Sequence, residues 1–490
     1  MVRSRLRLRP FVALAIAAIA AGITVAVLSR ESPRPPAKAP VAVTEASFRS
    51  RPDLTPPLMT VKTRQPAATK GKLLLAPKRR GGQSGPAILD DRGRLQWFHP
   101  MRNGIIANDF RVQRYKGKPV LTWWEGKTGD KGYGEGSWVI ADQSYREIAR
   151  VRAGNGLAGD LHDIELTNRG TAFITIYAKV DADLSVVNSD KDGEAMDSVI
   201  QEVDVATGEV VWEWRSLDHV ALGESHAGPP QTHRFAYDYF HINSIDENAD
   251  GDLLISARNT WGVYKIDKRT GRVLWRLGGL RSDFALGPGV RFAWQHDARW
   301  LPDGTISVFD NQATPKVEDF STAVVIRLDE RKRTATVARE LTHPDGVLAI
   351  AEGNAQALPG GGMFVGWGLA RRVSEISRDN KLLFDLTMPG DTDTYRAFKQ
   401  RWVGRPVEPP AFALEREGER VTAYASWNGA TEITRWQLLA GPSADALKPV
   451  AGVRRQGFET AIEAEGPGPW FAVRALRGKR VLGTSQPKQG

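Results

Sequence analysis

Three histidines stand at recurring places in this chain, and together they are candidates for chemistry at a single site. Of the eight histidines, only His162, His241 and His296 stand at the start of runs of alternating apolar residues. An imidazole can attack an electrophile and form a covalent intermediate, or it can bind a metal ion in its neutral form. Spacing alone does not separate these two chemistries, because no local HxH or HExxH pair is present.

Arg258 favours the first of these chemistries. It ends the strand-like DLLISAR run in the unit that begins at His241. A fixed guanidinium beside imidazoles repels a divalent cation but binds an oxyanion through two parallel hydrogen bonds. Asn243, two residues after His241, can face the same side of a strand. The set predicts a cradle for a sulfuryl or phosphoryl group, although an interblade salt bridge is the alternative for Arg258.

The elements that must position these residues form a longer recurrence. Five polar signatures precede apolar-alternating segments, at intervals of 54, 79, 55 and 58 residues. They are Asn108-Asp109, His162-Asp163, His241-Ile242-Asn243, His296-Asp297 and Asn354-Ala355-Gln356. Such a recurrence is typical of repeat folds, whose units bury their apolar faces against their neighbours. In a propeller, equivalent positions of all blades face one channel, so the histidines would meet there.

A second repeated element also favours blades. Residues 202–214 and 264–278 each read as a strand, a turn and a second strand that contains tryptophan. Weaker copies occur at 324–338 and 373–384, and the segment 86–98 has the same form and can close the ring with the last strands. The sequence therefore predicts an all-β fold with a six-bladed β-propeller over residues 61–405.

The ends of the chain differ from this body. The PVEPP segment at 406–410 marks a boundary, after which residues 406–490 alternate as a small β-sandwich of fibronectin type III character. Four arginines precede the uncharged apolar run 11–28. We interpret residues 1–30 as an uncleaved membrane anchor, because LSRE at 28–31 is a poor cleavage site for the alternative, a signal peptide. Residues 31–60 then form a tether rich in proline and alanine, and the body lies outside the cytoplasm.

Charge and composition exclude several classes of function. The net charge is +10, but residues 1–80 carry 16 Lys and Arg against 3 Asp and Glu, so the body is slightly acidic. We therefore expect no nucleic-acid partner, and the basic end fits an anionic membrane surface. No cysteine is present, which excludes disulfides, thiolate metal sites and cysteine nucleophiles.

Several segments resemble the PAPS-independent aryl sulfotransferase family across residues 100–405. They are 161–176, 212–219, 239–258, 273–279, 294–312 and 353–368. HINSI followed by SAR, and QHDA with FDN, form the specific combination. Members of the family are six-bladed propellers that transfer sulfuryl groups from aryl sulfate esters to phenols. The blade that begins at Asn354 departs from the pattern of the better-known bacterial members.

The resemblance implies roles for individual residues. The family nucleophile lies in a QH motif and becomes sulfated, which places this role on His296. The H-x-N-S motif of the family corresponds to His241 and Asn243. The arginine that closes the next strand corresponds to Arg258, and a histidine of an earlier blade corresponds to His162. Asp297, Asn311 and Asn354 are further candidates for contacts with the substrate. No metal or other cofactor is implied.

Two other classes of function stay open on the sequence alone. One is a metal-dependent propeller hydrolase, of lactonase or phosphotriesterase type. The other is a non-catalytic propeller tethered to the membrane. Trp123, Trp124, Trp261 and Trp367 are candidates for stacking on an aryl substrate, with a place in the interblade core as the alternative.

Overall fold

The computed structural model describes residues 45–129, 131–230, 235–466 and 468–490, and nearly all of their regular structure is β-strand. Four 3-10 helices of one turn each complete it: η1 (Ser185–Val187), η2 (Ser216–Asp218), η3 (Leu222–Glu224) and η4 (Gly368–Ala370). In these residues no helix is long and apolar enough to cross a membrane. The predicted anchor at 11–28 lies outside them. The predicted all-β class is confirmed.

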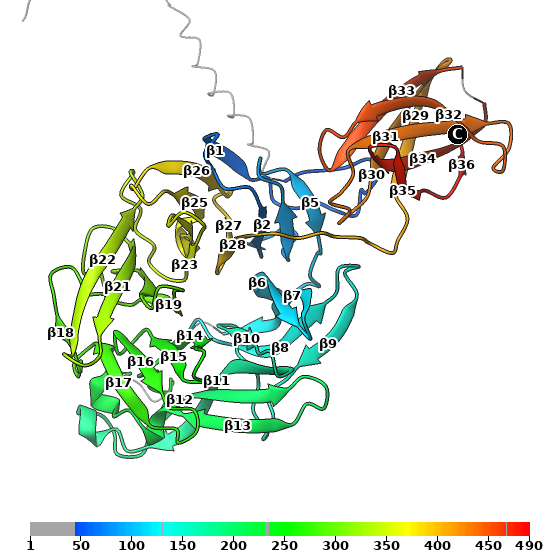
Figure 1. Cartoon of the computed structure of the whole chain (residues 1–490). Coiled ribbons are helices and arrows are strands. Elements are labelled where there is room, and N and C mark those ends of the chain that lie inside the picture. The colour runs from blue at the N-terminus through cyan, green and yellow to red at the C-terminus, as the bar shows by residue number, and fades with distance from the viewer. Residues whose placement is uncertain (1–44, 130, 231–234, 467) are drawn as a thin grey trace, which may run out of the picture. The chain divides into compact units, whose positions relative to one another are not determined.

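Six sheets follow one another along the chain, and all their strand pairs are antiparallel except the edge pair of the fourth sheet (Figure 1). The first three blades are β6 (Ile106–Tyr115), β7 (Lys118–Thr128), β8 (Gly134–Ala141) and β9 (Glu147–Val151); β10 (Ile164–Leu166), β11 (Thr171–Ala182), β12 (Gly193–Asp204) and β13 (Val210–Arg215); and β14 (Ile242–Glu247), β15 (Leu253–Ala257), β16 (Gly262–Ile266) and β17 (Val273–Gly278). The fourth is β19 (His296–Trp300), β20 (Ile306–Asp310), β21 (Thr322–Asp329) and β22 (Thr334–Thr342), with β18 (Ala285–Leu286) at its edge. The fifth is β23 (Asn354–Ala357), β24 (Met363–Gly366), β25 (Arg372–Ile376) and β26 (Leu382–Thr387), with β1 (Thr60–Arg64) at its edge.

The sixth blade joins the two ends of this region and closes the ring. Its inner strand, β28 (Ala397–Gln400), pairs with β2 (Lys72–Leu75), which is followed by β4 (Ala87–Leu89) and β5 (Leu95–Phe98). The small ladder of β3 (Lys78–Arg79) and β27 (Thr392–Asp393) lies next to these strands in sequence. Successive inner strands contact one another round the whole circle. This strand order is that of a β-propeller, and the number of sheets agrees with the six blades predicted.

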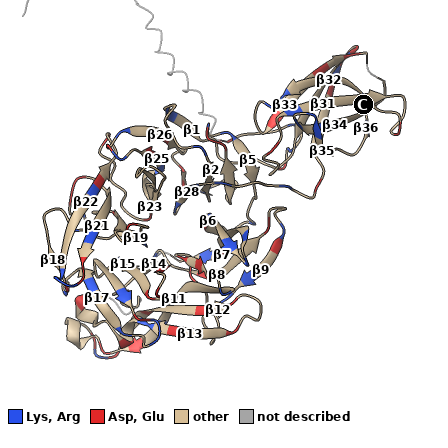
Figure 2. Cartoon of the chain, in the orientation of Figure 1, with Lys and Arg blue, Asp and Glu red and all other residues tan. Residues whose placement is uncertain are grey.

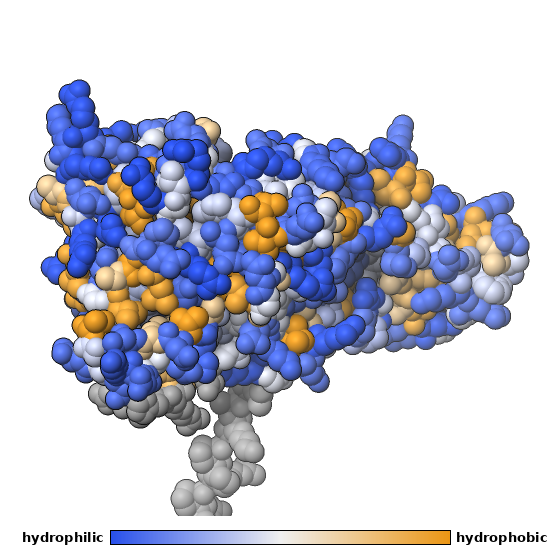
Figure 3. All heavy atoms as spheres, turned by 90° about the horizontal axis from the view of Figure 1, so that it is seen from below, coloured by the Kyte–Doolittle hydropathy of each residue, from blue (hydrophilic) through white to orange (hydrophobic). Residues whose placement is uncertain are grey.

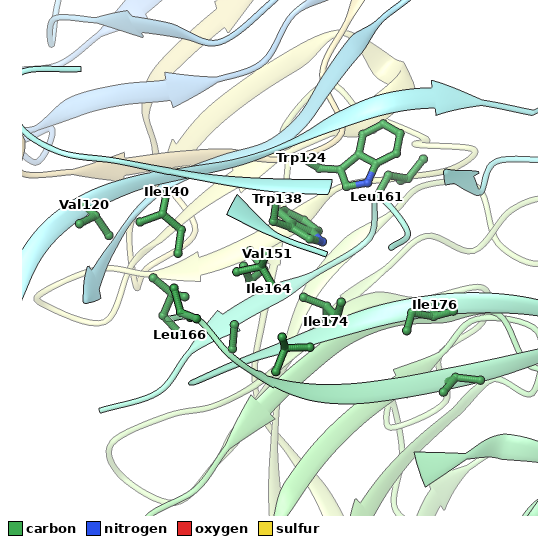
Figure 4. Close-up of a cluster of buried hydrophobic side chains, with 14 of the residues drawn as sticks. Val120, Trp124, Trp138, Ile140, Val151, Leu161, Ile164, Leu166, Ile174 and Ile176 are labelled. Carbon is green, nitrogen blue, oxygen red and sulfur yellow. The ribbon is translucent and has the colours of Figure 1, made fainter. Parts of the chain in front are cut away.

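Apolar side chains on facing blades hold the ring together. Trp124 and Trp138 of the first blade are fully buried against Ile164 and Ile174 of the second (Figure 4). Burial of such a side chain contributes about 1.5–3 kcal/mol. The tryptophans of the predicted hairpins also join blades, since the Trp214 indole donates a 3.0 Å hydrogen bond to the Gly271 carbonyl of the next blade.

The described part of the predicted tether makes specific contacts. Leu54 is buried beside Phe98 and Phe458, and the Ser50 amide donates a 2.6 Å hydrogen bond to Glu459. The composition of 31–60 suggested an extended linker throughout. From Glu45 onward the chain instead packs, because Phe48 and Leu54 have apolar partners.

The C-terminal residues form two sheets that share one apolar core. One contains β29 (Ala411–Glu417), β30 (Arg420–Ser426) and β33 (Glu459–Glu465), and the other contains β31 (Arg435–Gly441), β32 (Lys448–Arg454), β34 (Trp470–Arg477), β35 (Arg480–Thr484) and β36 (Lys488–Gln489). Trp436 is fully buried between the sheets. Two packed sheets agree with the predicted sandwich, and its fibronectin type III character stays a prediction.

The surface is mixed in character. The face in Figure 3 is mainly hydrophilic, with separate hydrophobic patches. Residues of both charge signs lie on the blades and on the C-terminal sheets (Figure 2). Scattered apolar patches of this kind are normal for a folded surface.

Buried charges meet inside the ring, where the inner strands converge. Arg396 is fully buried and donates hydrogen bonds to Asp109 (3.0 Å) and Asp163 (3.2 Å). Asp163 also accepts 2.7 Å hydrogen bonds from Arg111 and Arg299. Burial raises the pKa of Asp163, but the three arginines outweigh this effect and hold that pKa well below its ordinary value. The cluster separates two cavities, which open from opposite ends of the inner strands.

Arg396→Met is expected to lower the free energy of unfolding by about 3–5 kcal/mol, because it removes the hydrogen bond to the buried Asp109 carboxylate and one of the three arginines that neutralise Asp163. Urea unfolding followed by circular dichroism measures this loss. Arg420→Met is the matched control, since Arg420 pairs with Glu463 at an exposed site and its loss should be far smaller. Equal losses in both variants would show that the cluster is not a stabilising unit.

Candidate active site

His162, His241 and His296 come together from three consecutive blades. His162 precedes β10 by two residues, His241 directly precedes β14, and His296 is the first residue of β19. All three line one cavity of about 530 Å³. Its other described lining residues are Lys78, Arg80, Ile106, Asn108, Thr128, Gly129, Lys131, Gly132, Leu161, Asp238, Arg258, Asn259, Ala351, Glu352, Leu369 and Tyr395.

Carboxylates orient the rings of His162 and His241. The ring centroids are 5.0 Å apart and the rings are nearly perpendicular. Nδ1 of His162 is hydrogen-bonded to Asp160, and Nδ1 of His241 to Asp238. With Nδ1 held in this way, Nε2 is the ring nitrogen left for a ligand in the cavity.

The two carboxylates differ in how their charge is shared. Asp160 also accepts the backbone amides of His162 (3.0 Å) and Gly134 (2.8 Å). Asp238 holds the imidazole through Oδ2, and its Oδ1 is buried with no hydrogen-bond partner among the described residues. Fewer donors therefore share the Asp238 carboxylate than share the Asp160 carboxylate.

The pKa of His241 reflects two opposing effects. Burial lowers this pKa, and the Asp238 carboxylate raises it again without fully restoring it. The ring is therefore neutral at pH 7 in the empty site. A bound anion next to it would raise the pKa and favour the protonated form.

Asn311 fixes which nitrogen of His296 carries the proton. Its amide nitrogen donates to the carbonyls of Ala349 (2.9 Å) and Glu352 (2.8 Å), so its oxygen must face Nδ1 of His296, at 2.7 Å. Because that oxygen can only accept, the hydrogen-bond network assigns the proton to Nδ1 and the lone pair to Nε2.

The surroundings keep His296 neutral. Burial, followed by the nearby charge of Arg258, holds the pKa of this imidazole well below its ordinary value. Its Nε2 lone pair is therefore available at neutral pH, as a nucleophile requires.

Arg258 presents a guanidinium that no acid neutralises directly. It lies over the Trp294 ring, 4.7 Å from the centroid, and donates a 2.8 Å hydrogen bond to Asn259. Within the described residues it has no carboxylate within 4.0 Å. The interblade salt bridge considered for Arg258 is thus absent from the described residues, and the group can bind an anion in the cavity.

Three predicted substrate contacts lie elsewhere. The Asn243 side chain donates to the Gln295 carbonyl (2.8 Å), and the Asn354 side chain exchanges two 2.9 Å hydrogen bonds with the Ala397 backbone. Each joins one blade to the next. Asp297 belongs to the buried ionic cluster and lines the cavity at the opposite end. None of the three lines the histidine cavity, and Asn311 acts on His296 rather than lining it.

The backbone explains why Asn243 and Asp297 point away. The ladder between β14 and β15 shifts register between Ile242 and Ser244, and the ladder between β19 and β20 shifts between His296 and Arg299. Asp297 also has a positive φ of 55°. Such bulges redirect side chains, so simple alternation along the strand fails here.

Three imidazoles and one unneutralised guanidinium face a single cavity. Among the described residues, no group of three or more His, Cys, Asp or Glu is arranged to hold a metal ion. The arrangement fits a tetrahedral oxyanion beside a nucleophilic nitrogen.

The family model for arylsulfotransferase (ASST) matches residues 111–388, which is more than half of the chain. This chain belongs to the arylsulfotransferase family. The resemblance seen in the sequence motifs is thereby confirmed. All three cavity histidines and Arg258 lie within the part of this arylsulfotransferase chain that the model matches.

Other comparisons give only distant likeness. No curated protein sequence matches this arylsulfotransferase chain. A protein of unknown function from Bacteroides caccae is 16% identical, with a TM-score of 0.42, and the match covers 68% of this chain and 100% of that one. Virginiamycin B lyase from Staphylococcus aureus is 9% identical, with a TM-score of 0.35, over 76% of this chain and 97% of that one. The fold assignment therefore depends on the strand order, not on these likenesses.

Some residues of the site could not be found from the repeat. Asp160 and Asp238 precede their histidines by two and three residues, whereas the signatures drew attention to the acids that follow. Lys78, Arg80 and Lys131 reach the cavity from outside the signature strands, without any motif. The only available signal was the spacing of Asp and His in GDLH and DYFH.

Proposed function

We propose that this arylsulfotransferase family member transfers a sulfuryl group from an aryl sulfate ester to a phenol through a sulfohistidine at His296. The observation that carries the proposal is the hydrogen bond between Nδ1 of His296 and Asn311, which leaves Nε2 free in the cavity that Arg258 also lines. A lone pair on Nε2 and a cation for the sulfate oxygens are the two requirements for attack at sulfur.

In the first step the Nε2 lone pair of His296 forms a bond to sulfur. The bond between sulfur and the aryl oxygen breaks, and its electron pair leaves with the phenolate. Protonated His241 gives that oxygen its Nε2 proton, while Asp238 supports the ring through Nδ1. The negative sulfate ester, by raising the pKa of His241, favours this protonated form.

In the second step a phenol enters the same cavity. Neutral His241 takes its proton, and the phenolic oxygen attacks the sulfur of the sulfohistidine. The N–S bond breaks, its electron pair returns to Nε2 of His296, and the new sulfate ester leaves. We assign the proton transfer to His241 rather than His162 because the Asp238 charge is shared with fewer donors.

Arg258 stabilises the sulfuryl oxygens in both transition states. A donor aimed at developing charge in a site of this kind contributes about 3 kcal/mol. The tetrahedral anion needs no metal in this scheme. A metal-dependent hydrolase is the second candidate function, since imidazoles are common metal ligands.

Intact-mass analysis tests the proposal. After incubation with 4-nitrophenyl sulfate and no acceptor, the protein is expected to gain the mass of one sulfuryl group. Acid should remove the group, a phenol should collect it, and a chelator should have no effect. If turnover instead stops with a chelator and returns with a divalent metal, the hydrolase function replaces the transferase.

We also propose that the protein is anchored in a membrane by residues 11–28, with its body outside the cytoplasm. The supports are the length of the apolar run and the preceding arginines. The full-length protein is expected to fractionate with membranes, and protease added from outside should digest the body. Release of a body with its N-terminus near residue 30 would identify the segment as a cleaved signal peptide.

A further inference from the structure

The histidine cavity has two halves, set by the order of the blades round the ring. Blades two, three and four supply His162, His241, Arg258 and His296. Blades five and six, which face them across the channel, supply Glu352, Lys78 and Arg80, and the β7–β8 loop of blade one supplies Lys131, whereas Asp238 comes from the segment before β14. When the sulfuryl group lies among the imidazoles, the organic part of a donor or acceptor therefore extends toward the rest of the lining, which includes Arg80 and Lys131.

Two cations of the lining have no acidic partner among the described residues: Arg80, which follows β3, and Lys131 in the β7–β8 loop. Arg80 and Lys131 are both exposed, and neither forms an ion pair with a described residue. The Lys131 ammonium lies over the Phe235 ring, 4.0 Å from its centroid. Lys78, by contrast, is bound to Glu352 and lies 3.1 Å from Asp393, so its charge is already neutralised.

A buried amide adds a neutral hydrogen-bonding group to the same cavity. Asn108 is 1% exposed, and its Oδ1 has no hydrogen-bond partner among the described residues. It lines the cavity from the first blade. A polar group buried without a partner is costly, so a ligand that bonds to it gains affinity.

Aromatic surface is scarce in this cavity. Tyr395 is the one aromatic residue among its described lining residues. Trp124 and Trp367 are fully buried, Trp123 is 4% exposed, and these three tryptophans and Trp261 lie outside the lining. The cavity therefore distinguishes its substrates by charge and hydrogen bonding more than by stacking.

From these contacts we infer that the organic part of the substrate carries a second anionic group, a carboxylate, phosphonate or sulfate, bound by Arg80 and Lys131. The inference rests on the proposed sulfuryl transfer and names its substrate class: phenols and aryl sulfates with an acidic substituent. Each exposed cation should change the selectivity by about 2- to 5-fold, so the pair should give about 10-fold. The effect should weaken with salt, because the screening length at 0.1 M is about 10 Å.

Three acceptors that share one phenol ring test the inference. The donor is 4-nitrophenyl sulfate, and the acceptors are 4-hydroxyphenylacetate, its neutral amide and tyramine, which is cationic. The ratio of kcat/KM for the anion to that for the amide should be about 10 at low salt. Tyramine should be the poorest acceptor. A fourth arm with (4-hydroxyphenyl)methylphosphonate shows which anion is preferred.

Variants show which residues cause the preference for the anionic acceptor. The double variant R80A/K131A should bring the ratio close to one, while Lys381→Ala, an exposed cation in the outer turn of the fifth blade, should leave it unchanged. A ratio near one in the unaltered protein overturns the inference. A high ratio that survives in R80A/K131A overturns it as well.

If the proposed sulfuryl transfer does not occur, the result differs from a failure of the anion subsite. In that case 4-nitrophenyl sulfate does not label His296, whatever the acceptor selectivity. The anion subsite is then measured by calorimetric binding of 4-hydroxyphenylacetate and its amide to the unaltered protein and to R80A/K131A. Preferential binding of the anion that the double variant loses supports the subsite, and equal binding of the two compounds refutes it.

Discussion

His296→Ala is expected to abolish formation of the sulfuryl adduct and to reduce transfer to background. His296 is the ring whose lone-pair nitrogen is fixed by Asn311 and whose pKa is lowered so far that it stays neutral. His162 and His241 have Nδ1 bound to carboxylates, which suits them to exchanging protons rather than to carrying the group. Intact mass and peptide mapping after incubation with 4-nitrophenyl sulfate measure the adduct.

Two further variants serve as controls for this experiment. His219→Ala removes a half-buried histidine that stacks on Trp214 away from the cavity, and it should keep the adduct. His296→Gln keeps a polar side chain of similar length, so that loss of the adduct with a normal unfolding transition separates chemistry from folding. An adduct of normal yield in either His296 variant would move the nucleophile to another residue.

The pH dependence of labelling has a definite sign. Since burial holds the pKa of His296 well below its ordinary value, Nε2 keeps its lone pair as the pH falls below that value. Adduct formation should therefore persist below pH 6.5, where an ordinary histidine becomes protonated. A loss of labelling centred near pH 6.5 would contradict the neutral ring assigned to His296.

The repeat pattern was sufficient to predict the architecture and the four central residues. Polar residues that recur before the first strand of successive units lie where the inner strands of a propeller converge on its channel. His162, His241, His296 and Arg258 accordingly share one cavity. The hairpins that contain Trp214 and Trp275 were also predictable, since their strands and turns have the same spacing in successive blades.

The remaining site residues could not be predicted, for two physical reasons. Bulges at Asn243 and Asp297 redirect side chains that strict alternation would place beside the histidines. Lys131, in the β7–β8 loop, and Arg80, directly after β3, reach the cavity from outside the signature strands. A repeat specifies equivalent places in the strands of successive blades, but it carries no information about the loops that join those strands.

Arg258→Leu is expected to slow adduct formation by about 100- to 1,000-fold, the effect of removing one preorganised donor from a developing oxyanion. Arg258 has no carboxylate within 4.0 Å among the described residues, so its charge is available to the sulfuryl oxygens. Stopped-flow release of 4-nitrophenolate measures the first step without the second.

A lysine variant and added guanidinium ion separate the effect of the charge at position 258 from the effect of the planar side-chain geometry. Arg258→Lys keeps the cation over Trp294 but loses the planar pair of donors, so it should fall between the wild-type protein and the leucine variant. Arg258→Ala leaves room for a guanidinium ion, and added guanidinium should restore part of the rate at concentrations that do not unfold the protein. Rescue by the ion requires that the group act on the bound sulfate itself, because a residue needed only for packing would not be replaced by a free cation. Full activity in Arg258→Leu would leave the sulfuryl charge to the imidazoles alone, and the anion-binding role of Arg258 would be wrong.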